Sequence, residues 1–150
     1  MSNIIVFGGA GYCGAVLVPR LLDAGHKVTI FDTFWYGKNV FDETKNNLNL
    51  IEGDVKSVAI PEKCNVIFYD AGNDPVEQFR SLSNIYKYCE DEFILVVDDA
   101  NFNGVVETTE DFIKAKGLKI LYERKILTSV PEDANTWWNG LYITLLQKNK

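Results

Sequence analysis

The sequence has little of several features that define large classes of protein. Its 150 residues include three cysteines, Cys13, Cys64 and Cys89, and one histidine, His26. Cysteines this few and this scattered exclude a disulfide framework and a metal-binding cysteine cluster, and they are typical of a reducing cytoplasm. A zinc site or a Ser-His-Asp triad has little support with a single histidine.

Basic runs and long apolar segments are also missing. The formal net charge is −6, so nucleic acid and anionic membrane surfaces are not expected partners. No apolar stretch reaches the about 18 residues that a membrane span needs. The first residues, Met-Ser-Asn-Ile-Ile-Val, lack the basic start of a signal peptide. We therefore expect a cytoplasmic protein that binds neither membrane nor nucleic acid.

Hydrophobic residues make up 47% of the chain, enough for one domain with a real core. Apolar runs alternate with segments of helical period, which predicts a single doubly wound α/β domain over 1–150, with a mostly parallel sheet of about seven strands. The predicted helices cover about 12–24, 75–90 and 103–116, and 33–47 and 131–138 are predicted loops. The predicted strands cover about 3–8, 27–32, 48–54, 65–70, 93–98, 118–128 and 140–148, the last two as an antiparallel ribbon.

A glycine motif near the start of the chain carries the strongest functional signal. Gly8, Gly11 and Gly14 have the spacing G-x-x-G-x-x-G, between the apolar run 4–7 and the helix-like run 15–22. Glycines let the backbone turn tightly and approach phosphates, and the N–H groups of a helix N-terminus favour negative charge. The motif in this context predicts a site for a dinucleotide pyrophosphate.

An acidic residue lies where the same cofactor would need it. Asp32 ends the second predicted strand, 18 residues beyond Gly14. A carboxylate there is placed to accept hydrogen bonds from an adenosine ribose, and it repels a 2′-phosphate, so NAD is favoured over NADP. The alternative is a glycine-rich turn of an ordinary α/β protein, with Asp32 as a solvated strand end.

Residues 1–55 resemble the extended short-chain dehydrogenase/reductases, the family of nucleotide-sugar epimerases and dehydratases. The resemblance rests on Gly8-Gly9-Ala10-Gly11-Tyr12-Cys13-Gly14, Phe31-Asp32-Thr33-Phe34-Trp35-Tyr36-Gly37 and Glu52-Gly53-Asp54-Val55. It implies that Asp54 meets the adenine and that Val55 lines its pocket. The expected cofactor-binding residues are Gly8, Gly11, Tyr12, Cys13, Gly14, Asp32, Asp54, Val55, Ala71 and Gly72.

The catalytic pair of that family is not found in the sequence. Its chemistry needs Tyr-x-x-x-Lys, and no tyrosine here has a lysine four residues on. Tyr86 is followed at that position by Glu90, and Tyr122 by Ile126. No catalytic residue can therefore be assigned, and hydride transfer is not expected from this chain.

Residues 48–150 resemble the second half of a class I S-adenosylmethionine-dependent methyltransferase. The resemblance rests on Phe68-Tyr69-Asp70-Ala71-Gly72-Asn73, Val96-Val97-Asp98-Asp99-Ala100-Asn101-Phe102 and Trp137-Trp138-Asn139-Gly140-Leu141-Tyr142-Ile143. It implies a divalent cation at Asp70, Asp98 and Asp99, with Asn101 beside them, and these hard oxygen ligands suit Mg²⁺. In the alternative, Asp98 and Asp99 only end a strand and cap the next helix.

Together the two resemblances describe a chain of two Rossmann-like halves, 1–55 and 56–150, joined near 50–54. This arrangement predicts the strand order 3-2-1-4-5-7-6. Three functions stay open: a protein that binds a nucleotide cofactor, NAD; a small metal-assisted methyltransferase that uses S-adenosylmethionine; and a non-catalytic relic that forms a homodimer.

The positions of several further residues in the sequence indicate their roles. His26 lies in a turn away from the strand ends that bind ligands, so no catalytic role is expected. Cys13 is expected to be a small packing residue, although a helix start can lower a thiol pKa. The aromatic residues Phe34, Trp35, Tyr36 and Phe41 could cover one face of the sheet, flank the adenosine or pack against a second subunit, and the last two are favoured. Trp137 and Trp138 could form a substrate wall or plug the core, and the core is favoured.

Overall fold

The computed structural model describes residues 1–150 except 39–40, 42–45, 58, 130–134 and 150. The predicted loops 33–47 and 131–138 therefore lie partly outside the described residues. The strands are β1 (Asn3–Phe7), β2 (Lys27–Asp32), β3 (Leu48–Glu52), β4 (Cys64–Tyr69), β5 (Cys89–Asp98), β6 (Lys119–Ile126) and β7 (Leu141–Gln147). The helices are α1 (Tyr12–Asp23), α2 (Pro75–Ile85) and α3 (Val105–Ala115), with short 3₁₀ turns η1 (Val55–Ser57) and η2 (Tyr86–Tyr88).

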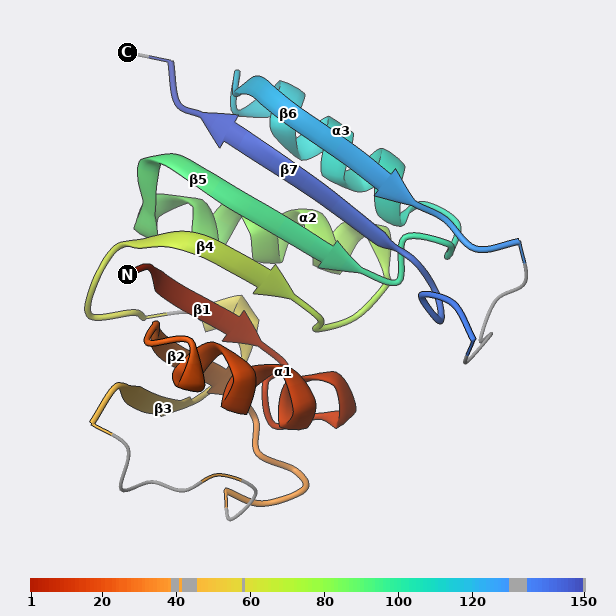
Figure 1. The fold of residues 1–150 in the computed structure, drawn as a ribbon. Coiled ribbons are helices and arrows are strands. Elements are labelled where there is room, and N and C mark those ends of the chain that lie inside the picture. The colour runs from red at the N-terminus through yellow and green to blue at the C-terminus, as the bar shows by residue number, and fades with distance from the viewer. Residues whose placement is uncertain (39–40, 42–45, 58, 130–134, 150) are drawn as a thin grey trace.

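The strands form one sheet in the order β3-β2-β1-β4-β5-β7-β6 (Figure 1). The pairs from β3 to β5 are parallel, whereas β7 runs antiparallel to both of its neighbours, β5 and β6. The predicted order and the antiparallel closing ribbon are thus confirmed, and the fold is Rossmann-like α/β. Among the described residues, no helix is long and apolar enough to cross a membrane.

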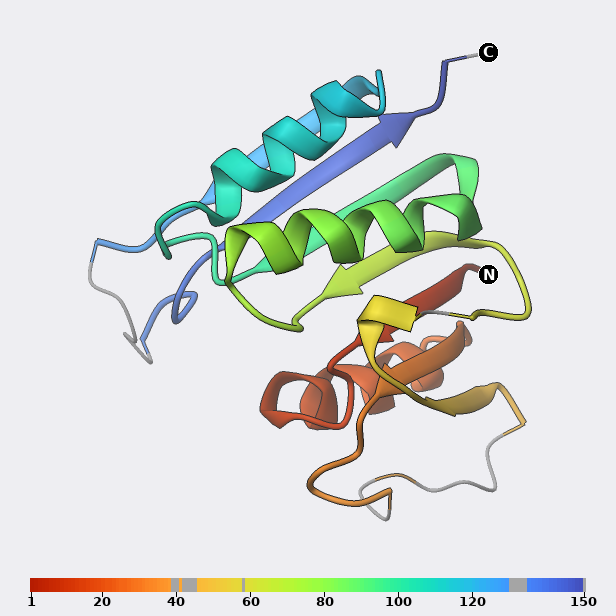
Figure 2. The same ribbon diagram turned by 180° about the vertical axis from the view of Figure 1, so that it is seen from behind.

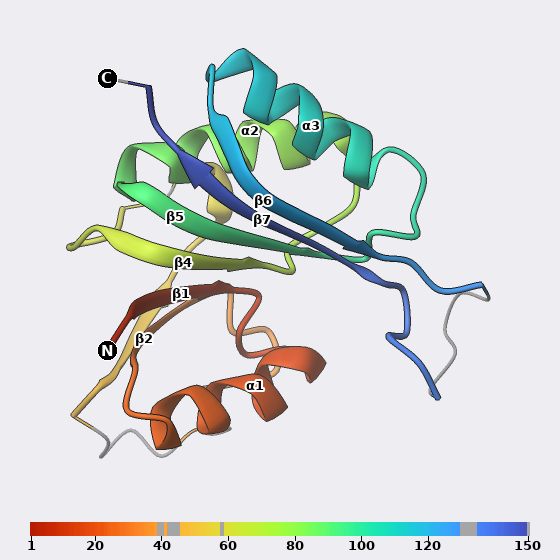
Figure 3. The ribbon, with the colours of Figure 1, turned by 45° about the horizontal axis from the view of Figure 1, so that its top comes forward.

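The helices cover the two faces of the sheet unequally. Figure 2 shows α2 and α3 side by side across one face of β4, β5, β7 and β6. On the other face, Figures 1 and 3 show α1 over β1 and β2 only. Two apolar clusters follow this division, one between the sheet and α2 and α3, and a smaller one beneath α1.

The second helix is shorter than predicted. The period of apolar residues predicts a helix over 75–90, but α2 ends at Ile85, and the turn η2 leads directly into β5. Cys89, counted as a helical position, has extended backbone and pairs with Cys64. Its buried side chain suits a helix face and a strand face equally well, so spacing alone gave the wrong boundary.

The start of α2 is fixed by local chemistry. The Asp74 carboxylate accepts a hydrogen bond from the backbone N–H of Glu77, at 2.9 Å, and Pro75 takes the first helical position. Both are favoured at a helix N-terminus, because Asp satisfies a free donor and Pro has none to satisfy. The helix therefore begins directly after the loop that leaves β4.

Replacing this cap should weaken the fold measurably. We expect Asp74→Ala to lower the free energy of unfolding by about 1 kcal/mol, because one helix N–H loses its acceptor. Urea denaturation followed by circular dichroism measures the change. Asp74→Asn, which keeps an acceptor oxygen, should stay close to wild type, and an equal loss in both variants would contradict the capping role.

Candidate functional site

The parallel strands bring four segments together at one edge of the sheet. Phe7 is in register with Phe31 and with Tyr69, and Tyr69 with Val97. The residues that follow these positions are Gly8, Asp32, Asp70 and Asp98. Ligands bind at this carboxyl edge in Rossmann-like folds, beside the point where the chain order reverses.

The three motif glycines meet three different surroundings. A Cβ on Gly8 would lie 1.9 Å from the backbone oxygen of Asp70, and one on Gly14 would lie 2.0 Å from that of Gly9. Both glycines are thus required by the packing of the chain itself. A Cβ on Gly11 would meet only the Gly8 oxygen, at 3.1 Å, and Gly11 faces a cleft.

That cleft has a volume of about 640 Å³ and is strongly acidic. Four aspartates line it, and the described part of the lining holds no lysine, arginine or histidine. Its lining residues are Gly8, Gly11, Tyr12, Cys13, Asp32, Tyr36, Asp70, Asp98, Asp99, Thr136 and Trp138. The first half of the chain supplies the glycine loop and the second half supplies most of the carboxylates.

A smaller pocket of about 180 Å³ adjoins the cleft, since Gly8 and Asp32 line both. It is formed by Gly8, Phe31, Asp32, Thr33, Gly53, Asp54, Val55 and Ala71. The structure thus brings Asp54, Val55 and Ala71 together with the glycine loop. Gly72 and Gly14 line neither space: Gly72 is exposed in the next loop, and Gly14 is buried beneath the motif.

Asp32 ties the glycine loop to the end of β2. Its Oδ2 accepts the backbone N–H of Ala10, at 2.9 Å, and its Oδ1 accepts that of Phe34, at 2.7 Å. A carboxylate oxygen has a second lone-pair site, so both oxygens can still accept from a ligand hydroxyl. The residue thus positions the loop and lines the cleft at once.

Three acidic side chains lie close together at the ends of β4 and β5. The Cys13 thiol donates to Oδ2 of Asp98 at 3.5 Å, and ligand atoms of Cys13, Asp70 and Asp98 all lie within 4.8 Å of one another. Asp99 is held differently, because its two oxygens accept from the amides of Asn73, at 2.9 Å, and Asn139, at 3.0 Å.

Two expectations about this cluster need correction. The amide of Asn101 is bonded to the backbone of Thr128, at 2.7 and 3.0 Å, so it fixes the loop after β6 rather than joining the carboxylates. The helix-capping alternative for Asp98 and Asp99 is wrong, because the N-cap of α3 is Gly104 and has no side-chain cap.

Burial and mutual repulsion raise the pKa values of Asp70, Asp98 and Cys13 in this cluster. Burial, followed by the negative charges of Asp98 and Asp99, raises the pKa of Asp70 to about 7. Burial also raises the pKa of Asp98. Desolvation in the cleft and the same acidic neighbours raise the pKa of the Cys13 thiol to about 12, which opposes the lowering that a helix start would give.

Other aromatic and thiol side chains lie elsewhere than expected. Cys13 is exposed and lines the cleft, so it is not a packing residue. Trp137 and Trp138 are 56% and 52% exposed, so they do not plug the core, and Trp138 lines the cleft. Phe34 and Phe41 are buried beneath α1, whereas Trp35 and Tyr36 are exposed and Tyr36 reaches the cleft.

The sequence reasoning missed Thr136 as a cleft residue. It belongs to the connection from β6 to β7, and β7 starts at the carboxyl edge because it runs antiparallel to β5. The predicted antiparallel ribbon could have indicated this residue. The loop that joins its two strands lies at the carboxyl edge of the sheet, where parallel strands bind ligands.

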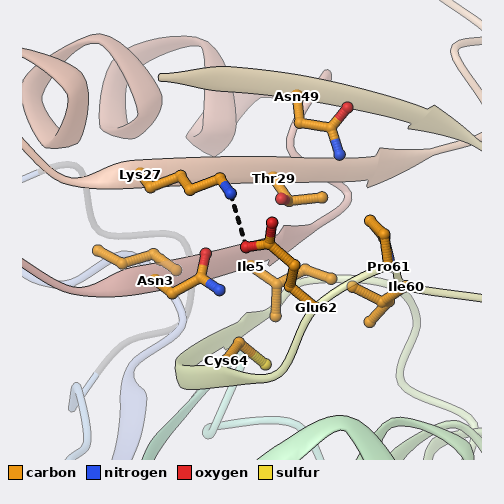
Figure 4. A pocket seen from close by; sticks show the side chains of 10 residues that line it. Asn3, Ile5, Lys27, Thr29, Asn49, Ile60, Pro61, Glu62 and Cys64 are labelled. Carbon is orange, nitrogen blue, oxygen red and sulfur yellow. Dashed lines mark hydrogen bonds and ion pairs between the residues drawn. The ribbon is translucent and has the colours of Figure 1, made fainter. Parts of the chain in front are cut away.

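A second cavity, of about 220 Å³, lies at the opposite edge of the sheet (Figure 4). Lys27 bridges to Glu62 across it, at 2.6 Å, and Ile60 and Cys64 form part of its wall. His26 lies at this edge too, where its Nδ1 accepts the backbone N–H of Ser2, which confirms its position away from the cleft.

The structure thus shows a Rossmann-like α/β protein with an acidic cleft at the carboxyl edge of its parallel strands. A profile of the NAD dependent epimerase/dehydratase family matches residues 4–73, beyond the predicted junction near 50–54. Both parts of the suspected resemblance are confirmed, this one in sequence and the methyltransferase one in three-dimensional structure.

Two curated proteins are similar in sequence. The UDP-glucose 4-epimerase of Corynebacterium glutamicum is 46% identical over 56 residues, which are 37% of this chain and 16% of that protein. The UDP-N-acetyl-alpha-D-glucosaminuronate decarboxylase of Bacillus cytotoxicus is 26% identical over 116 residues, 77% of this chain and 34% of that one. The chain thus spans about a third or less of these relatives.

Several solved structures with the same fold are methyltransferases. The glycopeptide N-methyltransferase MtfA complexed with sinefungin matches with a TM-score of 0.68 at 10% identity, over 99% of this chain and 87% of that one. The N-methyltransferase NodS of Bradyrhizobium japonicum matches with a TM-score of 0.68 at 14% identity, over 99% and 86%. At these identities the likeness shows the fold alone.

The raised pKa of Asp70 predicts a pH-dependent stability. The folded state holds a proton on Asp70 up to about pH 7, whereas the ordinary value is 3.8, so this group makes the fold less stable as the pH rises through that window. We expect Asp70→Asn to raise the melting temperature by roughly a few degrees at pH 8 and by less at pH 4.5.

Thermal unfolding in buffer with a chelator measures this difference. Asp111→Asn, at an exposed position on α3, is the matched control and should leave both melting temperatures unchanged. An equal effect of Asp70→Asn at the two pH values would show that the carboxyl group does not titrate between them.

Proposed function

We propose that this chain binds an adenine dinucleotide of the NAD type across the carboxyl edge of its sheet. The observation that supports it is that the three motif glycines differ in how closely other atoms approach them. Gly8 and Gly14 are glycine because a Cβ on either would lie within 2.0 Å of a backbone oxygen, whereas a Cβ on Gly11 would meet only the Gly8 oxygen, at 3.1 Å, and Gly11 lines the cleft. The glycine that the fold constrains least and that lines the cleft is the one suited to let a phosphate approach the backbone.

The start of α1 suits an anion. Its N-cap, Gly11, has no side-chain cap, and its first turn carries no acidic residue. The first N–H groups of a helix lack acceptors within the helix, so those of Tyr12 and Cys13 are available to a pyrophosphate. This is the role proposed for Gly8, Gly11, Tyr12, Cys13 and the supporting Gly14.

The adjoining pocket is the proposed site for the adenosine half of the cofactor. Asp32 would accept from the ribose hydroxyls, and Asp54, Val55 and Ala71 would surround the adenine. The epimerase relatives, by name, act on nucleotide sugars, but this chain spans little of them and its sequence has no Tyr-x-x-x-Lys. Binding of the nucleotide is therefore proposed, and hydride transfer is not.

The carboxylates argue for a second candidate. Asp32, Asp70, Asp98 and Asp99 line the same cleft, and no basic residue is among its described lining, so the cleft repels a diphosphate and attracts a cation. S-adenosylmethionine carries a positive sulfonium centre, and the methyltransferase fold agrees with it. Alternatively, Mg²⁺ held by Asp70 and Asp98, with Asp99 beside them, would neutralise the cleft and admit NAD.

Calorimetric titration separates these candidates. NAD⁺, NADH, S-adenosylmethionine and S-adenosylhomocysteine are each titrated into the protein, with Mg²⁺ and with a chelator. The proposal expects the nicotinamide nucleotides to bind, more tightly with Mg²⁺. If only the sulfur compounds bind, the methyltransferase-like candidate replaces it, and if none binds at millimolar concentration, both cofactor candidates fail and the non-catalytic relic remains.

Gly11→Ala tests the supporting observation directly. The new methyl group meets the Gly8 oxygen at 3.1 Å, a contact that a small shift of the loop relieves, and it adjoins the cleft, so NAD affinity should fall by about tenfold or more while the melting temperature falls less than in the control. Gly25→Ala is the matched control: Gly25 has φ +80 in a distant turn, so this variant should lose stability and keep its affinity. Unchanged NAD affinity in Gly11→Ala would refute the phosphate assignment.

A further inference from the structure

Part of one face of the sheet is composed for burial but has no described helix over it. On the side of α1, no described helix lies over β5, β7 and β6, whereas Val66 and Phe68 of β4 pack partly against the cluster beneath α1 (Figures 1 and 3). In β5, Ile94, Leu95, Val96 and Val97 are apolar in succession, although only Leu95 and Val97 face α2 and α3 and are buried. Strands that are apolar on both sides are typical of sheets covered on both faces.

The register shows which side chains share this face. Val66 pairs with Ile94, Ile94 with Leu145, and Leu145 with Tyr122. In the next row, Phe68, Val96, Ile143 and Arg124 pair in the same way. Paired residues point to the same side of a sheet. These two rows are called the open face, on which Ile94 is 37% and Tyr122 52% exposed.

A second apolar surface lies beside the open face. The buried side of α1 carries Gly14, Val18 and Leu22, so its opposite side, the outer face of α1, carries Tyr12, Val16, Pro19, Arg20 and Asp23. Tyr12 is 93% and Val16 56% exposed. An exposed valine and proline in the middle of an amphipathic helix are unexplained by the fold of one chain.

We propose that two copies of this chain associate through these surfaces, each laying its α1 on the open face of the other. On this face, α1 covers one half of the sheet and leaves the other half uncovered. A two-fold axis parallel to the strands places the α1 of each copy over the uncovered half of the other. Both α1 helices then share a single layer between two sheets, and the contact is isologous.

The charges at the rim of these surfaces are complementary in this arrangement. The axis keeps both sets of strands pointing the same way, so the end of the partner's α1 lies over the amino ends of the strands. Arg20 and Asp23 lie at that end of the helix, and Glu92 and Lys119 share a row across β5, β7 and β6 there. Arg20 thus approaches Glu92, and Asp23 approaches Lys119, across the contact.

The surfaces are also large enough. At strand and residue spacings of about 4.8 and 3.4 Å, the open face together with the row of Glu92 and Lys119 measures roughly 19 by 20 Å, and α1 adds a strip roughly 18 by 10 Å. With the relief of the side chains, this approaches the about 800 Å² that each partner buries in a standard stable interface. The proposal is independent of which cofactor the cleft binds.

Sedimentation velocity of the chain and two helix variants tests the proposal. The wild type should be dimeric at about 10 µM, and Val16→Glu should weaken the dimer by about tenfold or more, because it places a charge between two apolar faces. Val76→Glu is the matched control, since Val76 is 68% exposed on α2, on the other side of the sheet. It should stay dimeric.

Reversing charges tests the arrangement itself. Arg20→Glu and Glu92→Arg should each weaken the dimer, and the double variant should recover most of the affinity. A wild type that stays monomeric at about 100 µM overturns the proposal and assigns the open face to another partner. A dimer that Val16→Glu leaves intact, or a double variant no tighter than the single ones, also overturns it.

Discussion

The close approach of backbone to backbone beneath the glycine loop is the constraint on which the rest of the site depends. The positions of a Cβ on Gly8 and on Gly14 are both occupied by backbone atoms, of Asp70 and of Gly9. These contacts seat α1 against the sheet and bring the end of β4 to the loop. They also turn the loop so that Ala10 reaches the carboxylate of Asp32. Without them neither the cleft nor the pocket beside it would have its shape.

Two opposing electrostatic features meet in the cleft that results. The uncapped start of α1 favours negative charge, as the dehydrogenase-like half of the chain leads one to expect. The ends of β4 and β5 contribute Asp70 and Asp98, whose raised pKa values record how poorly the cleft tolerates more negative charge. A ligand that satisfies both features carries phosphate with a cation, or a positive centre of its own. The charge of the ligand is therefore the property that most sharply divides the candidate functions.

The helices also cover the two faces of the sheet unequally. In the described part of the chain, α2 and α3 cover one face of the seven-stranded sheet, and α1 covers only part of the other. The sequence of β5 and β7 nevertheless supplies apolar residues to both sides. Association through the uncovered side would complete the second layer, and it would do so next to the cleft.

Local spacing in the sequence determined the glycine loop, the place of Asp32, the alternation of strands and helices and, through the two resemblances, the strand order. Each depends on neighbours a few residues apart or on a strand pattern that repeats along the chain. Spacing could not place Cys13 beside Asp98, which lies 85 residues away, nor bring Trp138 and Thr136 to the cleft. Phe34 and Trp138 are both large aromatic residues, so composition could not show that Phe34 is buried and Trp138 is exposed. Only the tertiary structure decided these. The pairing of β1, β4 and β5 brings Cys13 to Asp98, and the insertion of β7 between β5 and β6 brings Thr136 and Trp138 to the cleft. The layer above each face decides whether a side chain is covered.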